Sequence, residues 1–338
     1  MKNILIDYDV PPDLVEVLAE TPGVSVRLLP DIQEAVRPQP PELIRDVDIL
    51  LCSYPPKNLT DMARLDFIQL TSAGFEHMYG LPLVERGIRV CNGRGLFDIP
   101  IAEWSLGMMI NLRRDVRGLI RNQENHVWDR DPRFEREING MTVGIWGYGG
   151  IGRQTARLAK AFGLKVHVLA RSGVSPRENI YVPEGKGDVA GVLPDKIFSY
   201  QEKEAFLSGL DFLVLTFPKT PATVGIVGER ELRALPKHAF FLNPARGNVV
   251  QEPVLIRALQ EGWIAGAALD AHVEEPLPPN HVFWDMPNVI VTPHLAGASQ
   301  TPAYGRRLMD LFTQNVRRRL AGKPLLNELT PDQLAGKV

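Results

Sequence analysis

The sequence predicts an α/β protein that is built on parallel sheets and divided into two domains. Its 338 residues exceed the size at which a single hydrophobic core usually stops growing. Short apolar runs alternate with helical or polar segments along most of the chain, a pattern that is typical of βαβ units. A glycine-rich turn between an expected strand and an expected helix is the third observation that favours this fold class.

Apolar runs in the first hundred residues predict the strands of one parallel sheet. They lie at residues 3–6, 24–29, 48–52, 67–70 and 88–91. A long helix is then expected over residues 101–121. A polar and charged segment, residues 125–137, connects this helix to the glycine-rich turn.

The glycine-rich turn reads MTVGIWGYGGIG from Met141 to Gly152, with a strand expected at 143–146 and a helix at 151–162. Glycine permits a sharp turn at the first motif position, close approach of a pyrophosphate at the second, and tight packing of helix on sheet at the third. In this context the motif predicts a Rossmann-like dinucleotide site, although glycine-rich turns also occur in ordinary loops. The expected contacts come from Gly147, Tyr148, Gly149, Gly150, Ile151 and Gly152.

The end of the next expected strand, residues 165–169, indicates which dinucleotide binds. A site that prefers NAD carries an acidic residue there for the ribose 2′-hydroxyl. This chain has Ala170 instead, followed by Arg171 and Ser172, which can donate hydrogen bonds to a 2′-phosphate. We therefore expect NADP(H) to be preferred and NAD(H) to be possible. The alternative is that Arg171 is only a surface charge.

Composition indicates small-molecule partners. The net charge is -2, with 23% charged and 44% hydrophobic residues, so there is no electrostatic footprint for nucleic acid or for an anionic membrane. No signal peptide and no apolar run of membrane-spanning length is expected. Cys52 and Cys91 end apolar runs and are expected to be buried free thiols rather than metal ligands, which suits the cytoplasm; no metal site is expected.

The rest of the chain repeats the alternation of strands and helices. Strands are expected at residues 213–216, 240–243, 265–269 and 289–291, and a helix at 300–320. Residues 172–197 are rich in proline and glycine, without periodicity, and predict a long surface excursion after the second strand of the cofactor domain.

Three blocks in the last third of the chain carry the chemistry. They read NPARGNVV, GAALDAHVEEP and TPHLAGAS. In order and spacing they match N-x-x-R-G-x-x-V, G-x-x-x-D-V-x-x-x-E-P and T-P-H-x-A-G-x-T, so the chain resembles the D-isomer-specific 2-hydroxyacid dehydrogenases over nearly its whole length. It departs from the pattern at Ala271 and His272, where the family usually has valine and an aromatic residue.

The resemblance implies site residues as well as chemistry. It implies that Arg246, Glu275 and His294 are the catalytic trio. It also implies that the substrate carboxylate is bound by Arg246 and by the turn Ser72, Ala73 and Gly74. Further cofactor contacts are implied for Phe217, Pro218, Thr223, Pro244, Ala245 and Asp270.

These residue types suit the reduction of a 2-oxo acid. The guanidinium of Arg246 can bind the carboxylate and polarise the neighbouring carbonyl. His294 can deliver the proton that the carbonyl oxygen needs after hydride transfer, and Glu275 can orient the imidazole. Each residue alone could be structural; together, behind a dinucleotide motif, they favour catalysis. The remaining histidines, His77, His126, His167, His238, His272 and His281, are interpreted as ordinary core or surface residues.

The resemblance also implies an architecture of two Rossmann-like, doubly wound parallel-sheet domains with the active site in the cleft between them. Residues 1–99 and 299–338 would form the substrate domain and residues 100–298 the dinucleotide-binding domain. A homodimer through the helix that begins near Ile101 is expected.

The expected activity is reduction of a small 2-oxo acid such as glyoxylate or hydroxypyruvate. Alternatives are a bulkier aromatic or branched 2-oxo acid, or a dinucleotide-sensing protein like the corepressors related to this family. Tyr54, Phe75 and Phe97 could contact a substrate side chain or could equally be packing residues.

Overall fold

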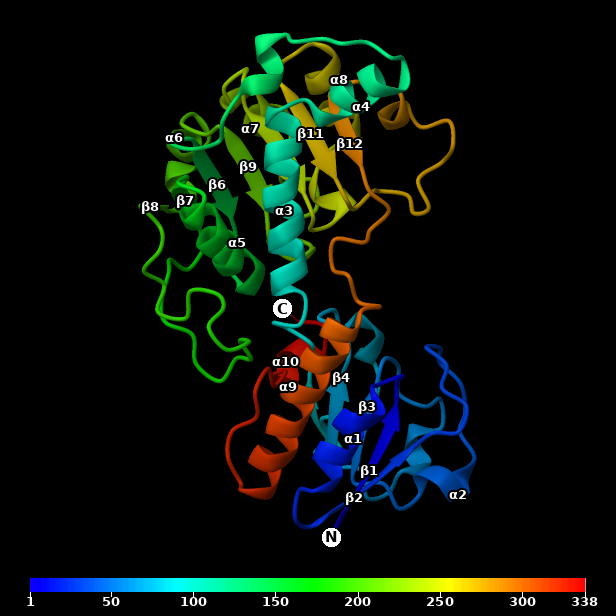
Figure 1. Ribbon diagram of the computed structural model, residues 1–338. Coiled ribbons are helices and arrows are strands. Elements are labelled where there is room, and N and C mark those ends of the chain that lie inside the picture. Colours follow the sequence, from blue (N-terminus) through cyan, green and yellow to red (C-terminus); the bar gives the residue numbers. More distant parts are fainter. Residues whose placement is uncertain (338) are drawn as a thin grey trace. The chain divides into compact units, whose positions relative to one another are not determined.

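The computed structural model describes residues 1–337 and divides into two compact units (Figure 1). Unit 1 contains Met1–Phe97, Glu178–Pro183 and the residues from Ser299 onward. Unit 2 contains Asp98–Arg177 and Glu184–Ala298. Each unit is built on one parallel sheet with helices packed against it, which confirms the predicted fold class.

Unit 1 contains a five-stranded parallel sheet in the order β2-β1-β3-β4-β5. Its strands are β1 (Lys2–Asp7), β2 (Val24–Leu28), β3 (Ile49–Cys52), β4 (Phe67–Leu70) and β5 (Arg89–Cys91). Its helices are α1 (Pro12–Ala19), α2 (Pro41–Ile44), α9 (Pro302–Leu320) and α10 (Pro331–Leu334).

The sheet of unit 1 is covered on both faces, as its apolar strands predict. Ile4 and Ile6 of β1 pack in a core with Leu308 and Phe312 of α9, while Leu5 between them points to the opposite core. This alternation follows from the two-residue period of a strand. All of these side chains are at most 2% exposed, so the sheet is a rigid platform for the loops at its edge.

Part of the excursion after β7 belongs to unit 1, which its proline- and glycine-rich sequence does not predict. Within Glu178–Pro183, the side chain of Tyr181 is 2% exposed and its hydroxyl donates a hydrogen bond to Asp310 at 2.8 Å. Its backbone amide donates to Asn327 at 3.1 Å. The sequence around Tyr181 has no apolar periodicity that would place this segment. Burial of the one large aromatic side chain therefore accounts for its position in unit 1.

Unit 2 contains a seven-stranded parallel sheet in the order β12-β11-β10-β9-β6-β7-β8. Its strands are β6 (Thr142–Trp146), β7 (Lys165–Leu169), β8 (Lys196–Phe198), β9 (Phe212–Leu215), β10 (Phe240–Asn243), β11 (Gly266–Leu269) and β12 (Val289–Val291). Its helices are α3 (Asp98–Arg113), α4 (Val116–Glu124), α5 (Gly150–Ala161), α6 (Lys203–Leu207), α7 (Glu229–Ala234) and α8 (Glu252–Gln260).

Two elements of unit 2 differ from the expectation. The edge strand β8 lies at the end of the segment interpreted as an irregular excursion. The helix expected over 101–121 is two helices, α3 and α4, because Asp115 adopts a left-handed conformation with φ 45°. The Asp115 carboxylate then accepts a hydrogen bond from the amide of Gly118 at 3.1 Å and begins a new helix. No described helix is both long and apolar enough to cross a membrane.

Candidate active site

The three candidate catalytic residues follow three neighbouring strands of unit 2. Arg246 comes after β10, Glu275 after β11 and His294 after β12, and these strands are adjacent and parallel. Parallel strands end at the same edge of a sheet, so the three loops share that edge. The glycine-rich loop after β6 lies at the same edge, with only β9 between β6 and β10.

The imidazole of His294 and the carboxylate of Glu275 are in direct contact, with 2.8 Å between Nδ1 and Oε2. The other carboxylate oxygen accepts a hydrogen bond from the backbone amide of His272 at 2.9 Å. Burial acts to raise the pKa of Glu275, but the His272 amide and the His294 imidazole outweigh it, so the pKa is lowered. An ionised Glu275 therefore holds Nδ1 and leaves the Nε2 edge of His294 for a reacting group.

The backbone of His294 is held in a left-handed conformation with φ 52°, which a residue other than glycine adopts at some cost. Its amide donates to the carbonyl oxygen of Asp270 at 2.8 Å. The Asp270 carboxylate, in a residue only 1% exposed, accepts hydrogen bonds from Thr292 Oγ1 at 2.5 Å and from the amides of Leu295 and Ala296. The Asp270 carboxylate thus fastens the loop that carries His294, and the expected contact of Asp270 with the nicotinamide stays a prediction.

Arg246 is exposed and is presented by a loop that Asn243 closes. The buried Asn243 side chain donates to the carbonyl of Arg246 at 2.9 Å and accepts from the amide of Ala245 at 3.1 Å. Behind Arg246, Gly247 touches the loop after β11 so closely that a Cβ there would lie 2.1 Å from the carbonyl carbon of His272. Only glycine allows the Arg246 loop and the Glu275 loop to meet in this way.

The glycines of the dinucleotide motif have the backbone geometry and the surrounding space that their positions predict. Gly147 has φ 94°, as a sharp turn requires, and Thr216 donates a hydrogen bond to its carbonyl at 2.6 Å. A Cβ on Gly152 would lie 2.5 Å from the carbonyl oxygen of Gly147, so the helix packs tightly. A Cβ on Gly149 would meet nothing within 4 Å, and no side chain caps α5 among the described residues. Open space at an uncapped helix start suits a pyrophosphate.

Two other residues of the motif face the protein. A Cβ on Gly150 would lie 1.9 Å from a carboxylate oxygen of Asp98, so a larger residue at this position would displace the Asp98 side chain. The hydroxyl of Tyr148 donates to Asp188 of the excursion at 2.7 Å, and Tyr148 is 8% exposed. The Tyr148 side chain therefore holds the excursion against the glycine-rich loop.

The residues expected at the adenosine ribose follow β7, beside the glycine-rich loop. The amide of Gly147 donates to the carbonyl of Leu169 at 2.9 Å, and Ala170 comes directly after Leu169. Arg171 and Ser172 are exposed at the same sheet edge. In the described part of the chain, no hydrogen bond or ion pair is found for these two side chains. Both are therefore available to a ligand above that edge.

The other expected cofactor contacts lie on the loops after β9 and β10. The Phe217 ring packs against Trp146 at 5.5 Å between ring centres, beside the glycine-rich loop. Thr223 donates to the carbonyl of Pro218 at 2.9 Å and closes the loop between them. Pro244 and Ala245 belong to the turn that Asn243 holds, described above. These contacts place all five residues at the same sheet edge as the trio.

In unit 1, the turn Ser72, Ala73 and Gly74 follows β4 and is held through its carbonyl groups. Asn92 donates to the carbonyl of Ala73 at 2.7 Å, and Ser72 donates through its hydroxyl to the carbonyl of Gly74 at 2.7 Å. The amides of Ala73 and Gly74 donate to no group in the described part of the chain. Two amides on a firmly held turn are suitable donors for a carboxylate.

The aromatic candidates in unit 1 differ in exposure. Phe97 packs on Tyr304, with 5.4 Å between ring centres, and Phe75 packs on a hydrophobic core. Tyr54 is 37% exposed and touches only the edge of the His77 ring, at 5.0 Å, among the ring contacts found. Tyr54 is thus the candidate with the most surface for a ligand.

Sequence reasoning overlooked several polar side chains that shape these loops. They share one position, at or directly after the last residue of a buried strand: Asn92, Thr216, Asn243 and Thr292. A lone Thr or Asn at the end of an apolar run is therefore the signal that could have found them. In residues 1–337, no three His, Cys, Asp or Glu side chains are grouped closely enough to hold a metal.

Comparison with known proteins identifies the family of the chain. Residues 106–296 match the family described as "D-isomer specific 2-hydroxyacid dehydrogenase, NAD binding domain". A glyoxylate reductase of Thermofilum pendens is 33% identical over 83% of this chain and 80% of its own length.

Solved structures give the same result. The NADPH-dependent glyoxylate/hydroxypyruvate reductase of Sinorhizobium meliloti, solved with NADP and sulfate, is 27% identical, with a TM-score of 0.72 over 99% of this chain and 100% of that one. A D-isomer specific 2-hydroxyacid dehydrogenase family protein of Aeromonas salmonicida is 26% identical, with a TM-score of 0.75 over 97% and 99%. The chain therefore belongs to the D-isomer specific 2-hydroxyacid dehydrogenases.

Proposed function

We propose that this protein is an NADPH-preferring reductase of small 2-oxo acids such as glyoxylate and hydroxypyruvate. The observation that carries the proposal is the 2.8 Å contact between His294 and Glu275, at the sheet edge that also carries Arg246 and the glycine-rich loop. The names of the relatives from Thermofilum pendens and Sinorhizobium meliloti support the substrate class. Unit 2 would bind the dinucleotide, and the Ser72 to Gly74 turn of unit 1 would bind the substrate carboxylate.

The side chains divide the reaction between them. Arg246 would bind the substrate carboxylate with one nitrogen and polarise the C2 carbonyl with another, which a planar guanidinium can do and an ammonium cannot. A bound reduced nicotinamide would supply the hydride to C2. His294 would then give the proton on Nε2 to the carbonyl oxygen, while Glu275 keeps the ring oriented and stabilises its charged form.

Cofactor preference rests on the residues after β7. Ala170 offers no carboxylate to hold a ribose 2′-hydroxyl or to repel a 2′-phosphate, whereas Arg171 and Ser172 offer donors. These residues favour NADPH over NADH. Residues Phe217, Pro218, Thr223, Pro244 and Ala245 would line the rest of the dinucleotide path.

We also infer a cytoplasmic homodimer. Cys52 and Cys91 are buried and unpaired, which suits a reducing compartment. Unit 2 exposes Ile120 of α4 and, just beyond this helix, Trp128, which is 91% exposed. Large apolar side chains of this kind favour contact with a second copy of the chain.

A substrate panel tests the proposal. Initial rates with glyoxylate, hydroxypyruvate, a branched 2-oxo acid and an aromatic 2-oxo acid, each with NADPH and with NADH, give kcat/KM for every pair. We expect the highest values for the two small acids with NADPH. Turnover of none of the acids, combined with tight dinucleotide binding, would support the sensing alternative; a higher value for the bulkier acids would reject the small-substrate assignment.

A further inference from the structure

A second histidine, His272, lies beside the candidate catalytic pair. It follows β11 and is 6% exposed. Its Nε2 lies 3.1 Å from the carbonyl oxygen of Thr292. A carbonyl oxygen can only accept a hydrogen bond, so Nε2 carries the hydrogen in this contact. Nδ1 is enclosed and has no partner in the described part of the chain, so the ring makes this one hydrogen bond.

The acceptor of that bond belongs to the turn that carries His294. The carbonyl of Thr292 also accepts the amide of His294, at 3.1 Å. The His272 imidazole thus fixes the peptide group two residues before the His294 side chain. The turn needs such support, because His294 is in the left-handed region at φ 52°.

The backbone of His272 contacts the segments of the other two trio members. Its amide donates to Glu275 Oε1 at 2.9 Å, and its carbonyl group packs against Gly247, next to Arg246. These backbone contacts would be available to any residue at position 272. The contribution of the imidazole itself is the link to Thr292.

We propose that His272 is a positioning residue that holds the Thr292 to His294 turn in register with Glu275 and Arg246. The proposal rests on the proposed roles of His294, Glu275 and Arg246. Without the imidazole link, the turn can relax from its left-handed conformation and move the His294 ring relative to its carboxylate partner. A displacement on the order of 1 Å at a reacting group can cost about a hundredfold in rate.

Two amide substitutions separate this role from simple packing. The side-chain nitrogen of glutamine reaches about as far as Nε2, whereas that of asparagine reaches only about as far as Nδ1. His272→Gln should therefore keep the hydrogen bond to Thr292, and His272→Asn should lose it. His272→Phe keeps a ring of similar shape and removes the donor. The assay uses the full-length protein with saturating glyoxylate and NADPH, and His294→Ala serves as the reference for loss of the proton donor.

We expect kcat to fall about tenfold to a hundredfold in His272→Asn and His272→Phe, and to stay within about threefold of native in His272→Gln. The dissociation constant for NADPH, measured by fluorescence titration, should change less than about threefold in all three variants. The reason is that the glycine-rich loop follows β6, whereas His272 follows β11. Thermal unfolding checks that each variant is folded; a variant that does not fold leaves the comparison to the other two.

Other results would overturn the proposal. One such result is a native kcat in folded His272→Phe or His272→Asn. The other is an equal loss of kcat in His272→Gln and His272→Asn. Failure of the trio assignment is distinguishable, because it would appear as near-native kcat in His294→Ala, whatever the variants at position 272 do.

Discussion

At the scale of single residues, the site depends on which side chains are committed to protein partners and which are left for a ligand. Glu275 uses both carboxylate oxygens, on His294 and on the amide of His272. Asp270 uses both of its oxygens on the same loop. Arg246, in contrast, makes one hydrogen bond, to the neighbouring carbonyl of Ala245, among the interactions found. This division makes Arg246 and the Nε2 edge of His294 the groups that can meet a substrate.

Conservative replacement of the guanidinium tests the role of Arg246. Arg246→Lys should lower kcat/KM for glyoxylate about tenfold to a hundredfold, because an ammonium cannot bind the carboxylate and polarise the carbonyl together. The measurement is steady-state kinetics, and Arg230→Lys, at a side chain 78% exposed, is the matched control. Near-native turnover by Arg246→Lys would remove Arg246 from the mechanism.

The proton donor is tested by the pH dependence in both directions. Glu275 has a lowered pKa, so it stays ionised over the neutral range and keeps its contact with Nδ1 of His294. We expect kcat/KM for reduction to fall as the pH rises and the proton donor is lost, and kcat/KM for oxidation to rise. His294→Ala should lower kcat by about 10²-fold to 10⁴-fold and remove both trends. Parallel profiles for the two directions would contradict the assignment.

The cofactor preference is tested at positions 170 and 171. Replacement of Ala170 by Asp together with Arg171 by Ala should shift the NADPH to NADH ratio of kcat/KM about tenfold to a hundredfold toward NADH. The shift follows because a phosphate donor is lost and a repelling carboxylate is gained. Arg171→Ala alone is the control and should weaken NADPH without improving NADH. If the native protein prefers NADH, then Arg171 is a surface charge.

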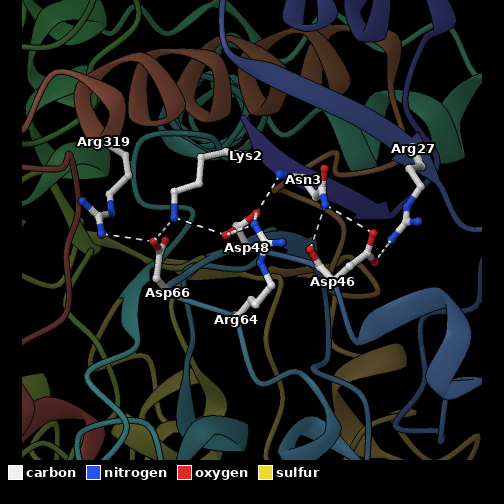
Figure 2. Close-up of polar contacts among 8 residues, drawn as sticks. All are labelled: Lys2, Asn3, Arg27, Asp46, Asp48, Arg64, Asp66 and Arg319. Carbon is white, nitrogen blue, oxygen red and sulfur yellow. Dashed lines mark hydrogen bonds and ion pairs between the residues drawn. The ribbon is translucent and has the colours of Figure 1, made fainter.

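At the scale of elements, the strands of unit 1 are joined at their amino ends by a network of charges (Figure 2). Asp48, just before β3, has a side chain only 5% exposed and lies at its centre. Its carboxylate accepts from the amide of Asn3 at 2.8 Å, from Arg64 at 3.0 Å and from Lys2 at 3.3 Å. Lys2 also donates to Asp66, just before β4. The network ties three neighbouring strands at the edge of the unit 1 sheet opposite to the Ser72 to Gly74 turn.

Loss of the central carboxylate should weaken unit 1. Asp48→Ala should lower the free energy of unfolding by about 1 to 3 kcal/mol, because it leaves the Asn3 amide and Arg64 without their acceptor and leaves Lys2 with Asp66 alone. Glu204→Gln, in an ion pair whose side chains are both more than 70% exposed, is the control and should change it by less than about 1 kcal/mol. Urea denaturation measures both; equal effects would mean that the network contributes nothing beyond a surface pair.

The same network gives stability a defined dependence on pH. Burial acts to raise the pKa of Asp48, but the Asn3 amide, Arg64 and Lys2 outweigh it and lower the pKa. Its contribution is therefore complete above the ordinary carboxyl pKa of about 4 and is lost as the pH falls through the lowered folded-state value. The stability difference between the native protein and Asp48→Ala should shrink over that acid range.

At the scale of the whole molecule, the proposed homodimer is tested by light scattering during size-exclusion chromatography. We expect the mass of two chains, and partial or complete dissociation of Trp128→Asp, because a carboxylate would be buried at an apolar contact. Val192→Asp, at another exposed apolar side chain of unit 2, is the control. A native monomer at micromolar concentration would reject the dimer, and an unchanged dimer in Trp128→Asp would move the interface elsewhere.

The chain sequence by itself determined the fold class, most strands and the dinucleotide motif. The reason is local: buried parallel strands are short apolar runs such as residues 67–70, and the turn after β6 requires glycine at Gly147 and Gly152. The three blocks around Arg246, Glu275 and His294 could also be recognised in the sequence, because each follows directly on such a strand.

Only the tertiary structure decided how distant polar groups pair. The sequence has no sign that Tyr181 is buried in unit 1, that Asp270 holds the loop of His294, or that His272 donates to Thr292. The break between α3 and α4 likewise depends on one left-handed residue, Asp115. Hydrogen bonds of this kind join residues that are far apart along the chain or in rare backbone conformations, so periodicity does not encode them; they form only when neighbouring strands bring their loops to a common edge.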